Sequence, residues 1–238
     1  MEKRQKIHEG KAKAVYSTDD PDRLIIDFTD TATAFDGAKR GTIHEKGRLN
    51  NLISALFFEK LAEAGIPTHY RGTLSDREML VVPVEIVMVE MVVRNIATGS
   101  LCRRLPFIDG TELEPPLVEL FYKDDSLGDP LINDDHALLM GLASREELAE
   151  MKRLSLAIND ALRPYLMDAG IVLVDFKLEF GRYQGGLVLA DEISPDTCRF
   201  WDASTKEKMD KDRFRKDMGK IEEAYQEIYQ RLTRLKGD

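Results

Sequence analysis

The segment from residue 174 to 181, Val-Asp-Phe-Lys-Leu-Glu-Phe-Gly, restricts the possible folds of this chain most strongly. Side chains on a β-strand point alternately to its two faces, so Asp175, Lys177 and Glu179 are predicted to share one face. The apolar side chains between them would form a core layer on the other face. A half-exposed strand with a surface ion pair gives the same pattern, so this segment alone leaves both interpretations open.

The next apolar run favours a functional site. Residues 187–190, Leu-Val-Leu-Ala, follow a glycine-rich turn and end at Asp191. If the two runs pair as a hairpin, Asp191 returns roughly opposite Glu179, and two such carboxylates repel unless a cation lies between them. Mg²⁺ binds one or two carboxylates together with substrate phosphates. Glu179 and Asp191 are therefore predicted magnesium ligands, with Lys177 beside them to neutralise a phosphate.

Two further segments carry weaker signals for phosphate binding. Gly10-Lys11-Ala12-Lys13 places two lysines on one face of a predicted strand beside a glycine that lets a ligand approach, although a lysine-rich edge strand has the same composition. Residues 94–100, Arg-Asn-Ile-Ala-Thr-Gly-Ser, end in a turn that offers a guanidinium, backbone N–H groups and a hydroxyl, although such a segment alone is more often an exposed turn. Neither a G-x-x-x-x-G-K-[ST] loop nor a G-x-G-x-x-G fingerprint is present, which disfavours P-loop and Rossmann proteins.

The charge and cysteine content exclude some classes of protein. The formal net charge is −9, which is unsuited to nucleic-acid binding and repels phosphorylated substrates at long range. A phosphate site would therefore need a local cluster of lysine and arginine. Two cysteines make no disulfide framework, so a reduced, cytoplasmic location is expected, with Cys198 as a packed thiol. We expect no signal peptide and no membrane-spanning segment.

The spacing of apolar residues predicts an α+β fold in which strands precede most of the helices. A β-rich N-terminal lobe, residues 1–86, and a larger α+β lobe, residues 87–238, are expected to enclose a cleft. Strands are predicted over 12–16, 24–28, 80–93, 171–180 and 187–193, helices over 46–64, 144–169 and 211–235, and an irregular segment over 106–135.

Taken together, these segments resemble the SAICAR synthetase family in its compact bacterial form. The resemblance rests on residues 10–16, on Arg94 with Gly99-Ser100, on residues 174–181, on residues 191–201 and on residues 210–215, and it covers nearly the whole chain in order. One difference is Met88, where the family usually has a proline six residues before its signature arginine.

The resemblance implies an ATP-dependent ligase of purine biosynthesis. Such an enzyme joins L-aspartate to the carboxylate of carboxyaminoimidazole ribotide (CAIR) through an acyl phosphate, and gives SAICAR, ADP and phosphate. It implies a kinase-like or ATP-grasp-like pair of lobes, ATP and Mg²⁺, small-molecule substrates and a homodimer. A small-molecule kinase and a non-catalytic nucleotide-binding module remain alternatives, which the dependence of phosphate release on aspartate would distinguish.

The resemblance also implies roles for individual residues. Catalytic roles fall to Asp175, Lys177 and Arg199, and the metal ligands are Glu179 and Asp191. The ATP site comprises Gly10, Lys11, Ala12, Lys13, Leu24, Val81, Ile86, Lys177, Glu179 and Asp191. The site for CAIR and aspartate comprises Arg94, Ser100, Lys123, Asp129, Asp175, Asp196, Arg199, Lys211 and Arg215.

Overall fold

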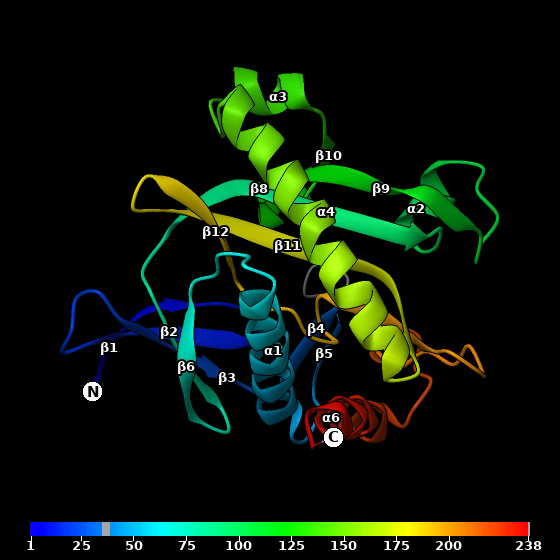
Figure 1. The fold of residues 1–238 in the computed structure, drawn as a ribbon, viewed down its shortest axis with the longest axis horizontal. Helices are drawn as coiled ribbons and strands as arrows, with labels where there is room; N and C mark the ends of the chain where they lie inside the picture. The colour runs from blue at the N-terminus through cyan, green and yellow to red at the C-terminus, as the bar shows by residue number, and fades with distance from the viewer. Residues whose placement is uncertain (35–38, 238) are drawn as a thin grey trace.

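Two antiparallel sheets carry most of the strands in this computed structural model, which describes residues 1–34 and 39–237 (Figure 1). The first sheet has the strand order β1-β2-β3-β7-β6. Its strands are β1 (Lys3–Glu9), β2 (Lys13–Thr18), β3 (Leu24–Phe28), β7 (Glu78–Val81) and β6 (Tyr70–Ser75). A separate hairpin follows β3 and comprises β4 (Thr31–Ala34) and β5 (Lys39–Thr42).

The second sheet has the order β10-β9-β8-β11-β12, and β13 also pairs with β11. Its strands are β8 (Glu85–Ile96), β9 (Glu112–Tyr122), β10 (Leu131–Ile132), β11 (Ile171–Tyr183), β12 (Gly186–Ala190) and β13 (Cys198–Asp202). The strand β11 is therefore bonded to three others, and it contains the charged alternation of the sequence.

The helices pack around these sheets, and α4 crosses the second sheet diagonally in Figure 1. The long helices are α1 (Lys46–Glu63), α4 (Arg145–Asp168) and α6 (Ile221–Gly237). The short ones are α2 (Ser100–Arg104), η1 (Asp125–Leu127), α3 (Asp134–Leu139) and α5 (Asp212–Arg215). None of the helices in the described ranges is long and apolar enough to cross a membrane.

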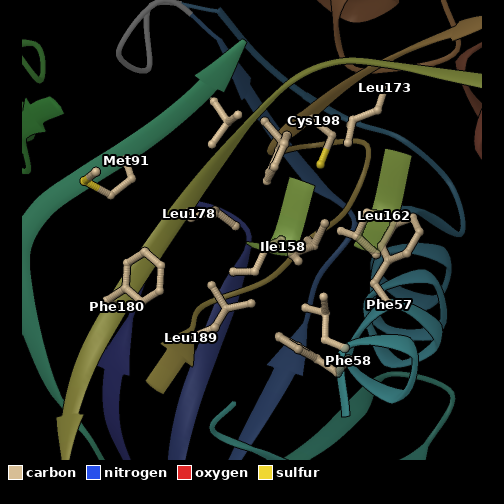
Figure 2. Packing of buried hydrophobic residues seen from close by; sticks show 14 of the residues in the cluster. Phe57, Phe58, Met91, Ile158, Leu162, Leu173, Leu178, Phe180, Leu189 and Cys198 are labelled. Carbon is tan, nitrogen blue, oxygen red and sulfur yellow. The ribbon is translucent and has the colours of Figure 1, made fainter. Parts of the chain in front are cut away.

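The apolar face of β11 lies in the core, as its alternation predicts. Phe176, Leu178 and Phe180 are almost completely buried and belong to one large hydrophobic cluster. Figure 2 shows Leu178 and Phe180 near Leu189 of β12, with helix residues packed beside them. Burial of this face stabilises the sheet by about 1.5–3 kcal/mol per large side chain. The opposite face of β11 is thereby fixed toward the charged residues described below.

The α+β class is confirmed, and most predicted elements appear within two or three residues of their expected bounds. The predicted helix 144–169 is α4, whose Ser144–Glu147 capping box is present. The predicted run 80–93 is two successive strands, β7 and β8. The expected boundary at residue 86 falls just inside β8, and the division into two lobes remains a prediction.

Two predictions about elements are wrong. The segment 106–135 contains the long strand β9, in which Pro115 and Pro116 lie before the part that β10 covers, so no ladder bond on that edge is lost there. The predicted helix 211–235 is two helices, α5 and α6. The chain turns between them, where Gly219 and two other residues have positive φ, and this turn ends the helical path.

Candidate active site

A cleft of about 890 Å³ lies against the charged face of β11. Residues of β2 and β3 from the first sheet, and of β8 and β11 from the second, line it together with the chain after β12. Every residue that the sequence analysis placed in a site lines this cleft: Gly10, Lys11, Ala12, Lys13, Leu24, Val81, Ile86, Arg94, Ser100, Lys123, Asp129, Asp175, Lys177, Glu179, Asp191, Asp196, Arg199, Lys211 and Arg215.

Strand pairing brings three carboxylates together in the cleft. Glu179 lies opposite Ala190 in the β11–β12 ladder, so Asp191 follows directly, as the hairpin predicted. On its other side, Glu179 lies opposite Glu90 of β8. Asp191 has a φ of 61°, a left-handed conformation that is uncommon for a residue with a side chain. The chain therefore holds Asp191 beside Glu179 at some conformational cost.

Three lysines compensate these carboxylates. The Nζ of Lys177 donates a hydrogen bond to Oε1 of Glu90 at 2.8 Å, and that of Lys123 donates to Oε1 of Glu179 at 2.9 Å. Lys13 pairs with Asp191. Burial and the neighbouring Asp191 oppose ionisation of Glu179, but Lys177 and Lys123 hold its pKa below the usual range. We call these residues, with Glu192, the carboxylate–lysine cluster.

The carboxylate–lysine cluster has the donor types that suit a hard divalent cation. Within the described ranges, no group of three or more His, Cys, Asp or Glu side chains is arranged to enclose a metal ion. Buried Glu179 and half-buried Asp191 present carboxylate oxygens on one side, and ligands from a bound phosphate would be needed to complete a metal shell. This arrangement fits Mg²⁺ that is carried by a nucleotide better than a metal bound by protein alone.

A second group, the arginine pocket, lies further along β11. Buried Arg94 donates to Oδ2 of Asp175 at 2.7 Å and to Oγ of Ser100 at 3.0 Å. Arg199 donates to the same Asp175 oxygen at 2.8 Å. A Cβ at Gly99, which has a φ of 59°, would lie 2.8 Å from Nη2 of Arg199. The glycine of the Gly-Ser pair is therefore needed both for the turn and to make room for the arginine.

A third group surrounds Asp196 in the wall of the cleft. Oδ2 of Asp196 accepts a hydrogen bond from Nζ of Lys46 at 2.8 Å, and Oδ1 accepts one from the hydroxyl of Tyr225 at 2.8 Å. Lys46 is fully buried at the start of α1, and Tyr225 is fully buried in α6. Burial opposes ionisation of Asp196, but Lys211 and Lys46, together with the Tyr225 hydroxyl, hold its pKa well below the usual range.

The other end of the cleft is apolar. Leu24, Val81 and Ile86 line it, close to Gly10 and Ala12. The neighbouring polar residues are Lys11, which pairs with Asp125 at 2.7 Å, and Asp129, whose carboxylate accepts the backbone N–H of Asp124. An apolar slot beside a glycine and lysines is suited to a flat ring that carries phosphates.

The family model for SAICAR synthetase matches residues 6–232. The chain belongs to the SAICAR synthetase family. A phosphoribosylaminoimidazole-succinocarboxamide synthase from Desulfitobacterium hafniense is 56% identical over 238 residues, and one from Persephonella marina is 54% identical, each over 100% of both chains.

Solved structures of the family have the same fold. The synthase from Ehrlichia chaffeensis has a TM-score of 0.94 at 45% identity, over 96% of this chain and 98% of that one. A SAICAR synthetase in complex with ADP has a TM-score of 0.92 at 51% identity, over 95% and 97% of the two chains. The resemblance inferred from the sequence is thereby confirmed.

Some residues that line the cleft, or that bind residues lining it, were not predicted from the sequence. Glu90 and Glu192 join the carboxylate–lysine cluster, and Lys46 and Tyr225 bind Asp196. A charged residue within an apolar strand was the available signal for Glu90, because such a residue is rarely buried without a partner. Lys46 gave no such signal, since a lysine is ordinary on a helix surface, and Tyr225 falls on the apolar stripe of the predicted C-terminal helix, which indicates burial but not its partner.

Proposed function

We propose that this chain joins L-aspartate to the carboxylate of CAIR at the expense of ATP, giving SAICAR, ADP and phosphate. Family membership over residues 6–232 carries the proposal, and the ADP complex of a relative at 51% identity supports the nucleotide. The cleft, with an apolar end, a carboxylate–lysine cluster and an arginine pocket in sequence, suits a nucleotide and a sugar phosphate bound together.

The chemistry requires activation of a carboxylate, because a carboxylate oxygen is a poor leaving group. ATP phosphorylates the CAIR carboxylate, and the amine of aspartate then displaces phosphate from the acyl phosphate. The enzyme's contribution is to position the reactants and to stabilise charge, as in phosphoryl transfer generally. The buried lysines suit this task, since burial in a low-dielectric site strengthens their interaction with phosphate.

The carboxylate–lysine cluster is proposed to bind the phosphates of ATP. Glu179 and Asp191 would hold Mg²⁺, which neutralises charge on the transferred phosphoryl group. Lys13 would bind ATP phosphates, and Lys177 would contact the transferring group. The nearby carboxylates keep Lys177 charged, because they raise its pKa well above the usual value although burial opposes this. Lys123 would stabilise Glu179 and face the substrates.

The arginine pocket is proposed to bind CAIR. Arg94, Ser100 and Arg199 would receive its phosphate or the carboxylate that becomes activated, and Asp175 would orient the imidazole amine. The ion pairs of both arginines with Asp175 fix the guanidinium groups before substrate arrives, which lowers the entropy lost on binding.

The remaining predicted residues extend these sites. Leu24, Val81 and Ile86 are proposed to pack against adenine, with Gly10, Lys11 and Ala12 over the phosphates. Asp129, Asp196, Lys211 and Arg215 are assigned to the side of the cleft that receives CAIR and aspartate.

A kinase-like pair of lobes, residues 1–86 and 87–238, is proposed around this cleft. The first sheet is built from residues 3–81 and the second from residues 85–202, which supports the division. A homodimer is the expected assembly by the family resemblance, and its mass in solution would test this.

Release of ADP with ATP and CAIR, measured with and without L-aspartate, tests the proposed function. A ligase shows steady-state ADP release that depends on aspartate, together with SAICAR formation. A small-molecule kinase would release ADP at the same steady rate without aspartate, and that result would contradict the proposal.

A further inference from the structure

Lys211 differs from the other cations of the cleft. Lys13, Lys123, Lys177, Arg94 and Arg199 each donate hydrogen bonds to carboxylates. In the described part of the chain, Nζ of Lys211 donates no hydrogen bond, and its nearest carboxylate oxygen is Oδ2 of Asp196 at 3.6 Å. Its side chain is only 13% exposed. A buried ammonium with unused donors is costly, so Lys211 is suited either to a ligand or to the neutral form.

Asp196 cannot satisfy Lys211 fully, because its carboxylate already has other partners. Lys46 donates to one oxygen and Tyr225 to the other, each at 2.8 Å. The backbone of Lys211 is also fixed, since its N–H donates to the carbonyl of Pro195 at 3.1 Å. Lys211 is thus held beside the Asp196 carboxylate, which its charge stabilises, but at 3.6 Å it donates no hydrogen bond to it.

The surroundings of Lys211 disfavour its charged form. Burial is the main cause, and Lys46 and Arg215 add repulsion, while Asp196 and Glu192 oppose these effects. The net result is a pKa below the usual value for lysine. In Lys13 and Lys177 the balance is opposite, because adjacent carboxylates raise the pKa although burial opposes this.

The proposed ligation needs a proton acceptor. Aspartate carries an α-ammonium at neutral pH, and its nitrogen has no free electron pair until a proton leaves. Asp191 and Asp196 are poor acceptors, since lysine partners hold their pKa values far below the usual range. Burial lowers the pKa of His69 to about 4, so this imidazole is also a weak base. Glu90 accepts a hydrogen bond from Lys177 and lies opposite Glu179, a proposed metal ligand.

We propose that Nζ of Lys211, in its neutral form, takes a proton from the α-ammonium of L-aspartate. This inference rests on the proposed function. The freed electron pair forms the C–N bond to the acyl carbon, the bond from that carbon to the phosphate oxygen breaks, and phosphate leaves with those electrons. The second proton of the amine leaves with the phosphate, giving an amide and hydrogen phosphate. The Lys211 ammonium then loses its proton to water before the next turnover.

Two substitutions separate proton transfer from simple charge. Lys211→Met removes the amine, and Lys211→Arg keeps a cation that cannot accept a proton, because guanidinium stays charged in proteins. Both are expected to lower kcat with aspartate by about 100-fold or more, as loss of a general base does. Lys60→Met is the control, because Lys60 does not line the cleft and forms an exposed pair with Glu63 on α1.

Hydroxylamine as a substitute nucleophile completes the test. Its nitrogen is largely neutral at pH 7, so its capture of the acyl phosphate requires no base. Hydroxylamine-dependent ADP release is expected to persist in both Lys211 variants, which also shows that they fold and phosphorylate CAIR. Equal losses with the two nucleophiles would overturn the proposal, and so would full activity of Lys211→Arg with aspartate. A raised aspartate KM at unchanged kcat would also overturn it, because Lys211 would then only bind substrate.

The pH profile gives a separate readout. Wild-type kcat should fall at acidic pH as Lys211 becomes protonated, whereas kcat of Lys211→Met should keep rising with pH as the α-ammonium of bound aspartate loses its own proton. Identical profiles would overturn the assignment. Absence of aspartate-dependent ADP release in the wild type would instead refute the proposed function, so the two failures are distinguishable.

Discussion

Replacement of Arg94 by methionine removes a buried guanidinium while it keeps most of the side-chain volume. Arg94 is 2% exposed and joins two carboxylates, Glu119 from β9 and Asp175 from β11, through hydrogen bonds of 2.7 Å each. Loss of one partner of a buried ion pair costs about 3–5 kcal/mol, because a charge is left in the interior.

Glu119 and Asp175 each have a second arginine partner, and these partners determine where in that range the loss of unfolding free energy falls. Glu119 also accepts hydrogen bonds from Arg104 at 2.8 and 3.0 Å, and Asp175 accepts from Arg199 at 2.8 and 3.1 Å. Neither carboxylate is left without a cation, so we expect the free energy of unfolding to fall by about 3 kcal/mol. Arg104→Met is the matched control, because Arg104 is 29% exposed and should cost about 1 kcal/mol or less.

Urea unfolding of the two variants and of the double variant measures these terms. The double variant leaves Glu119 without either arginine, so its loss of unfolding free energy should exceed the sum of the single losses.

In activity, Arg94→Met should raise the CAIR KM by about 10- to 150-fold, which corresponds to one charge-assisted hydrogen bond of 1.5–3 kcal/mol. ADP affinity, measured by calorimetry, should not change. An Arg94→Met variant no less stable than Arg104→Met, with an unchanged CAIR KM, would refute this account.

Three further predictions concern other groups of the site. Glu179→Gln and Asp191→Asn should each abolish turnover while the variants remain folded, as a cooperative urea unfolding transition would show. Near-normal activity at saturating Mg²⁺ would contradict their assignment as metal ligands. Lys46→Met should lower the free energy of unfolding by about 3–5 kcal/mol, because Asp196 then keeps, among the described residues, one hydrogen-bonding side chain, the Tyr225 hydroxyl. A loss below about 1 kcal/mol, typical of exposed pairs, would show that the pair is not buried in solution. Burial, with Asp212 nearby, raises the pKa of Asp210 to about 7 from an ordinary value of 3.8, so the folded state binds this proton more tightly than the unfolded chain does. That stabilisation is complete below pH 3.8 and is lost as the pH rises through 7, so wild type should lose stability relative to Asp210→Asn between pH 5 and pH 7.5 in urea titrations; a constant difference would contradict it.

Local patterns in the sequence predicted the central part of the site. The period of two in residues 174–181 and the turn before residues 187–190 were sufficient to bring Asp191 next to Glu179, because a hairpin is a short-range structure. The helix α4 was equally accessible, since its capping box and apolar stripe are both local signals.

Long-range partners could not be predicted in this way. Lys46 meets Asp196 across 150 positions of sequence, and nothing in the residues near either one indicates the other. The strand β1 is exposed along its whole length and carries no apolar period, so its existence depends on pairing with β2. The break between α5 and α6 includes Asp217 and Lys220, which adopt positive φ without being glycines.

The strand β11 fixes the distance between the arginine pocket and the carboxylate–lysine cluster. It rises about 3.3 Å per residue, so the backbone of Asp175 and that of Glu179 are about 13 Å apart along the strand. Substitution of side chains can alter affinity at either end, but it leaves this span unchanged. An insertion or deletion of one residue between them would instead turn one of the two carboxylates into the hydrophobic interior. Natural variation in length should therefore avoid this stretch and collect in the loops around it.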